Sequence, residues 1–65
     1  MTFSEWAILR RRELGLDAED PDFVYAYTTM QAALDAGEAP DSALLGWAIA
    51  LQVSEQEVRR RALVG

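Results

Sequence analysis

Apolar residues recur along this chain at intervals of three and four positions, the spacing of one face of a helix. Three long stripes and a short one are visible, and no segment alternates between apolar and polar residues with the period of a strand. The stripes are Phe3, Trp6, Leu9 and Leu14, then Phe23, Tyr27, Met30 and Leu34, then Leu44, Leu45, Ala48 and Leu51, and finally Val58 and Ala62. The pattern predicts helices and no sheet.

Residues suited to start a helix precede the first three stripes. The T-x-x-E sequence at Thr2 is a capping box, in which the hydroxyl and the carboxylate each accept a hydrogen bond from a free backbone amide. Asp20 can cap a second helix, and Pro21 suits its first position because proline has no amide to satisfy. Asp41 or Ser42 is expected to cap the third helix.

Glycines follow the first two stripes where those helices should end. Gly15 and Gly37 can take the left-handed conformation that closes a helix, and Leu16 can supply the apolar contact that accompanies such an ending. The expected helices are Phe3–Leu14, Pro21–Ala36, Asp41–Leu51 and Glu55–Val64. We therefore predict an all-α fold, a small bundle of four short helices in one domain spanning residues 1–65.

The sequence changes abruptly between the third and fourth stripes. Gln52 and Val53 interrupt the apolar period, and Ser54 then offers a hydroxyl to the free amides of a new helix. Glu57 can reach back to the Ser54 amide, which would complete a second capping box. The pattern predicts two helices joined by a tight turn.

The stretch from Leu44 to Leu63 resembles the helix-turn-helix of bacterial and phage DNA-binding regulators, over about 20 of the 65 residues. That family has a small residue where its helices cross closely, apolar residues around it, an apolar residue and a polar cap in the turn, and a β-branched anchor in the second helix. The matching residues are Trp47, Ala48, Leu51, Val53, Ser54 and Val58. The resemblance implies that the last two helices form a DNA-binding unit.

Two positions depart from the family pattern. Gln52 stands where the family usually has a glycine, so a left-handed turn there would cost roughly 1 kcal/mol. Arg61 stands where a second apolar anchor is expected, and only Ala62 or Leu63 could replace it. If the family geometry is kept, the resemblance implies that the fourth helix faces the major groove. The expected DNA-binding residues are Ser54, Glu55, Gln56, Arg59 and Arg60.

Charge restricts how such a protein could bind DNA. The formal net charge is −5, and phosphate neutralisation by basic residues supplies most non-specific affinity. Residues 1–45 hold three arginines against nine acids, a balance of −6, whereas residues 46–65 hold three arginines against two acids, a balance of +1. A single weakly basic helix supplies few phosphate contacts, so DNA binding would require a homodimer or a larger complex.

A second function is compatible with the same sequence: a small acidic module that binds another protein, such as an adaptor, an antitoxin-like partner or an inhibitor. Arg10 and Arg11 either pair with nearby acids on a solvated helix face or contact a phosphate or an acidic partner. Tyr25 lies off the apolar stripe and is either a half-buried surface residue or an interface anchor. Trp47 is expected to be mostly buried, with an outer interface position as the alternative.

Other functional classes lack the residues they need. The chain has no cysteine, histidine or lysine, which removes the common zinc ligands and the usual activators of a serine nucleophile. The acidic loop Asp17–Asp22 lacks the glycine and the final glutamate of a calcium loop. We expect no catalytic residue, cofactor, metal site or small-molecule substrate. Without a signal-like or membrane-spanning stretch, the expected location is cytoplasmic.

Overall fold

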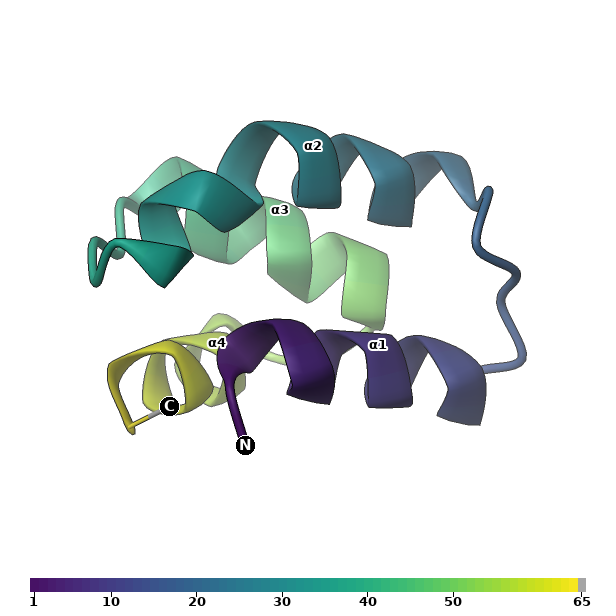
Figure 1. The fold of residues 1–65 in the computed structure, drawn as a ribbon, viewed down its shortest axis with the longest axis horizontal. Helices are drawn as coiled ribbons and strands as arrows, with labels where there is room; N and C mark the ends of the chain where they lie inside the picture. The colour runs from purple at the N-terminus through teal and green to yellow at the C-terminus, as the bar shows by residue number, and fades with distance from the viewer. Residues whose placement is uncertain (65) are drawn as a thin grey trace.

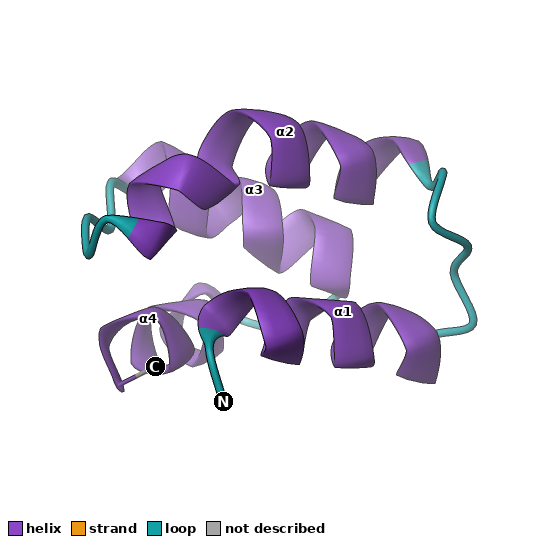
Figure 2. Ribbon diagram, viewed as in Figure 1, coloured by secondary structure: helices purple, strands orange, loops and turns teal. Residues whose placement is uncertain are grey.

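Four helices form in the computed structural model, which describes residues 1–64 (Figure 1). They are α1 (Phe3–Glu13), α2 (Pro21–Asp35), α3 (Asp41–Leu51) and α4 (Glu55–Val64). The described chain otherwise consists of loops and turns, and it contains no strand (Figure 2). The predicted all-α class and the four helices are confirmed, with α1 and α2 each ending one residue earlier than expected.

All four helices begin at the predicted residues, and the predicted caps of α1 and α2 are confirmed. The Thr2 hydroxyl accepts a hydrogen bond from the Glu5 amide at 3.2 Å, and the Glu5 carboxylate accepts one from the Thr2 amide at 3.3 Å. Asp20 caps α2 by accepting a hydrogen bond from the Phe23 amide at 3.1 Å. Both caps satisfy amides that the helix itself leaves free.

The predicted cap of α3 is wrong. The N-cap is Pro40, and no side chain caps this helix. The extended backbone of Pro40 directs its carbonyl to the amides of Ala43 and Leu44, at 3.0 and 3.1 Å. The helix therefore begins one residue earlier than a capping role for Asp41 would require, and Asp41 lies in its first turn.

Gly15 and Gly37 end α1 and α2 as predicted. Their φ angles are 74° and 84°, in the left-handed region that glycine adopts without steric cost. After each glycine the next amide returns to the helix, because Leu16 donates to the Arg11 carbonyl and Glu38 donates to the Ala33 carbonyl. These bonds satisfy carbonyls that would otherwise be free.

Trp47 lies at the centre of the core and is fully buried, as expected. Its ring meets those of Phe3 from α1 and Phe23 from α2 edge to face, both at centroid distances of 5.4 Å. Tyr27 makes a third edge contact at 6.3 Å. Aromatic rings favour this arrangement because the positive ring edge meets the negative ring face. One side chain of α3 thus holds α1 and α2 together.

The helices pack around α3 (Figure 1). α2 lies along one side of α3, where Met30 packs over Gly46 and fills the space that a larger residue would occupy. α4 follows the turn after α3 and packs against both α3 and α1. Within residues 1–64, no helix combines the length and apolar character needed to cross a bilayer.

Three residues of the predicted apolar stripes are instead exposed. One is Tyr27 of α2, which is 40% exposed although its ring contacts that of Trp47. Leu9 is 40% exposed because the side of α1 that packs inward carries Phe3 and Ala7. Leu45 is 48% exposed because α3 turns Leu44 and Ala48 toward the core. In each case the apolar stripe is broader than the face that the neighbouring helices cover.

Candidate functional site

The turn between α3 and α4 is a sharp corner that begins at Gln52. This residue has φ 56° and ψ 45°, the left-handed conformation, and its amide donates to the Ala48 carbonyl. The Val53 amide also donates to the Ala48 carbonyl, at 3.2 Å. The predicted break is therefore confirmed, and Gln52 takes the conformation usually given to glycine.

Ser54 caps α4, but the reciprocal half of the predicted capping box is wrong. The Ser54 hydroxyl accepts a hydrogen bond from the Glu57 amide at 3.1 Å. The Glu57 carboxylate, however, accepts from the Nε atoms of Arg60 and Arg61, both at 3.1 Å. A carboxylate binds a guanidinium more strongly than it binds a neutral amide, which explains the choice. Arg60 first and then Arg61 hold the pKa of Glu57 below its ordinary value.

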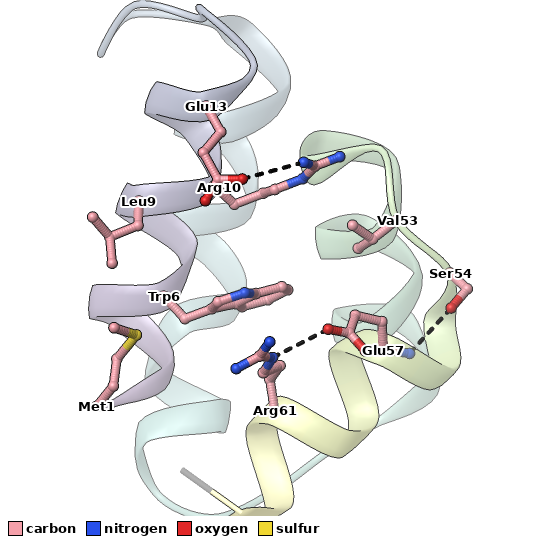
Figure 3. Close-up of a pocket in the computed structure, with 9 residues that line it drawn as sticks. All are labelled: Met1, Trp6, Leu9, Arg10, Glu13, Val53, Ser54, Glu57 and Arg61. Carbon is pink, nitrogen blue, oxygen red and sulfur yellow. Dashed lines mark hydrogen bonds and ion pairs between the residues drawn. The ribbon is translucent and has the colours of Figure 1, made fainter.

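The inward side of α4 is anchored mainly by Val58, which is fully buried, and by Ala62, which packs against the core. Arg61 takes a different position from the apolar anchor of the helix-turn-helix pattern. Its guanidinium carbon lies 5.3 Å from the centre of the Trp6 ring on α1, a distance that allows a cation–π contact (Figure 3). Ala62 therefore takes the role of the second anchor, and Arg61 joins α4 to α1.

The opposite side of α4 faces solvent and carries four of the five predicted DNA-binding residues. We call the exposed residues Glu55, Gln56, Arg59 and Arg60 the α4 outer face; Ser54 is exposed just before them. Their spacing of one, four and five positions places them on one side of a helix. The structure thus brings these residues together on a single surface.

Both arginines of the α4 outer face pair with acids while remaining at the surface. Arg59 places Nη2 at 3.3 Å from Oδ1 of Asp41, in the first turn of α3. Arg60 pairs with Glu57 within α4. The side chains of Arg59 and Arg60 are 48% and 66% exposed, so neither is folded into the core.

Arg10 and Arg11, predicted as partner contacts, are engaged within the chain. Arg10 donates from Nε to the Leu51 carbonyl at the end of α3, at 3.1 Å, and places Nη1 3.6 Å from the Glu13 carboxylate. Arg11 donates to the Leu16 carbonyl at 3.1 Å and lies over the Phe23 ring. Both arginines therefore support the fold, and the expected pairing with a nearby acid is found for Arg10, whose partner is Glu13.

The aromatic residues proposed for a partner interface separate into two environments. Trp47 has no exposed surface and cannot touch a partner in this fold, which corrects its assignment as an interface residue. Tyr25 is 61% exposed on α2 and stays available. Sequence reasoning missed Ile49, which is 59% exposed on α3 and lies one turn from Leu45. The four-residue spacing of this pair was visible, but nothing local indicated that it would face solvent.

A groove that sequence analysis did not identify runs between α1 and the α3–α4 turn (Figure 3). Its volume is about 630 Å³, and Trp6 lies between two ion pairs that line it. These pairs are Arg10 with Glu13 and Arg61 with Glu57. Charges of both signs are therefore already matched there, and the described residues offer no group of three or more potential metal ligands.

Comparisons of the chain with protein-family models, with curated proteins and with solved structures found no match. We therefore derive the role of the α4 outer face from its geometry and chemistry.

Proposed function

We propose that this protein is a small helix-turn-helix-like regulator that binds duplex DNA through the α4 outer face. The observation that carries the proposal is the corner at Gln52 and Ser54, after which Val58 anchors α4 in the core and the opposite side of the helix is exposed. A helix exposed along one side can enter the major groove, where base edges are read by hydrogen bonds. Gln56, Arg59 and Arg60 are side chains of the kind that make such bonds.

Electrostatics favour two copies acting together. Arg59 and Arg60 give the face its positive charge, but the chain as a whole carries −5. Each phosphate contact adds affinity, and two arginines add few. A dimer presents two such faces to successive half-sites and doubles the number of contacts. A larger complex that contains a basic partner would have the same effect.

The proposal is tested by titrating a labelled duplex of mixed sequence with wild-type protein and with single alanine variants. Arg59→Ala and Arg60→Ala should each weaken binding by about fivefold or more, and wild-type affinity should fall steeply between about 50 and 200 mM salt. Arg12→Ala is the matched control, because Arg12 is also exposed but lies at the end of α1.

Two results would contradict DNA binding by this face. One is a wild-type protein that does not bind the duplex at about 50 mM salt, where phosphate contacts are strongest. The other is an Arg12→Ala variant that loses as much affinity as Arg59→Ala, which would show a general charge effect and no specific surface.

A protein-interaction module is the second candidate, and the exposed pair Leu45 and Ile49 on α3 favours it. Two large apolar side chains one turn apart suit a helix that docks against a partner helix. The acidic first 45 residues would speed association with a basic partner. Under this alternative, changing both residues to Asn should abolish partner binding, whereas Arg59→Ala should leave it unchanged.

A further inference from the structure

Asp41 forms an ion pair with a residue of another helix, and capping of its own helix does not account for its position. The cap of α3 is Pro40, and no side chain completes it. The Asp41 carboxylate is 93% exposed, yet it lies against Arg59, from which it is separated by 18 positions in the sequence. The contact therefore joins the first turn of α3 to the α4 outer face.

For Arg59, the Asp41 carboxylate is the same kind of hydrogen-bond acceptor as a phosphate of the DNA backbone. Carboxylate and phosphate oxygens both accept charge-assisted hydrogen bonds from a guanidinium. The Nη2 to Oδ1 distance of 3.3 Å puts the carboxylate within hydrogen-bonding range of Arg59. A phosphate that approaches Arg59 must therefore displace this carboxylate, or it binds close to a second negative charge that repels it.

Glu57, the other acid that forms an ion pair with an arginine of this face, is placed differently. It is 25% exposed and binds Arg61 as well as Arg60. Arg61 in turn lies over Trp6, so changing Glu57 would disturb the contact between α4 and α1. Of these two acids, Asp41 is the one whose removal frees an arginine of the face with less disturbance of packing.

We propose that Asp41 acts as an intramolecular competitor for the phosphate that Arg59 would bind, and that it thereby sets the DNA affinity and its salt dependence. This inference rests on the proposed function. Because exposed ion pairs are weak, DNA can displace the carboxylate, and the expected effect of its loss is about two- to fivefold. Asp41 would thus favour release from weakly bound sites.

The test compares Asp41→Asn with Asp22→Asn in duplex titrations across a range of salt concentrations. Asp22 is a matched control: it is also exposed in the first turn of a helix, and α2 begins at the end of the molecule away from α4 (Figure 1). Both changes remove one negative charge and one acid near a helix N-terminus. Asp41→Asn should bind about two- to fivefold more tightly than Asp22→Asn, with a salt dependence steeper by about one phosphate contact.

The same comparison is then made in the Arg59→Ala background, where the advantage of Asp41→Asn should disappear. Asp41→Ser serves as a second variant, and circular dichroism verifies that each protein is folded. Equal affinities for Asp41→Asn and Asp22→Asn, with a wild-type protein that binds DNA, would overturn the inference and leave the proposed function intact. Failure of every protein to bind would overturn both. Tighter binding by Asp41→Asn than by Asp22→Asn, with the difference lost in the Arg59→Ala background, would support the inference.

Discussion

At the scale of single residues, Gln52 is where the backbone departs most from its local preference. It is the only residue other than glycine with a positive φ among residues 1–64. A side chain in this conformation crowds the following carbonyl, at a cost of roughly 1 kcal/mol. The residue is held there because its amide and that of Val53 both reach Ala48, which ends α3 and turns the chain toward α4.

We expect Gln52→Gly to stabilise the protein by up to about 1 kcal/mol, because glycine enters the left-handed region freely although it adds entropy to the unfolded chain. Urea denaturation followed by circular dichroism measures the change. Gly37→Ala is the opposite control: a methyl group there meets no atom within 4 Å, so only its φ of 84° opposes the change and stability should fall. A lower free energy of unfolding for Gln52→Gly than for wild type would show that the backbone of Gln52 is not strained.

At the scale of helices, hydrogen bonds from side chains to backbone amides at the N-termini of α1 and α4 fix where each helix begins. Glu5 completes the capping box of α1, whereas Glu57 accepts hydrogen bonds from two arginines and none from the amide of Ser54. The same T/S-x-x-E spacing thus gives two outcomes. The difference is that α4 places arginines three and four residues after its glutamate, which a helix brings to the same side.

The capping box of α1 predicts a pH dependence of stability. Hydrogen bonds from the Thr2 amide and then from its hydroxyl hold the pKa of Glu5 below its ordinary value. A carboxylate with a lowered folded pKa stabilises the fold above its unfolded pKa, and this contribution is lost as the pH falls from about 4.3 through the folded value. Glu5→Gln should therefore show a smaller loss of thermal stability than wild type over that range.

The control for this measurement is Glu38→Gln, which changes an exposed glutamate in the connection between α2 and α3. Thermal unfolding of the three proteins is followed at several pH values between about 6 and 3, a range that spans the ordinary glutamate pKa. Indistinguishable pH profiles for Glu5→Gln and wild type would show that the box does not couple protonation to folding.

At the scale of the whole molecule, a chain of 65 residues has little core to spare. Trp47 supplies much of it, since its ring touches aromatic residues of α1 and α2. Its indole Nε1 has no hydrogen-bond partner within the described chain, a cost that the surrounding rings must offset. The packing of α1 and α2 against α3 therefore depends strongly on this one side chain.

We expect Trp47→Ala to cost about 3–5 kcal/mol, which approaches the total stability of a domain of this size and should leave it largely unfolded at room temperature. Far-UV circular dichroism detects the loss of helix. Tyr25→Ala is the control, because Tyr25 is mostly exposed and should change stability by less than about 0.5 kcal/mol. A cooperatively folded Trp47→Ala protein would show that the core does not depend on this ring.

The sequence alone determined the helix positions, most of their caps and the corner after α3, because these depend on contacts within about five residues along the chain. Ser54, Glu55, Gln56, Arg59 and Arg60 could likewise be placed on one surface, since helical spacing decides that. Only the tertiary structure decided that Leu9, Leu45 and Ile49 are exposed, that Arg10 reaches Leu51, and that Asp41 lies against Arg59. These outcomes depend on how far each helix rotates against its neighbours, and helix packing sets that rotation through residues distant in the sequence.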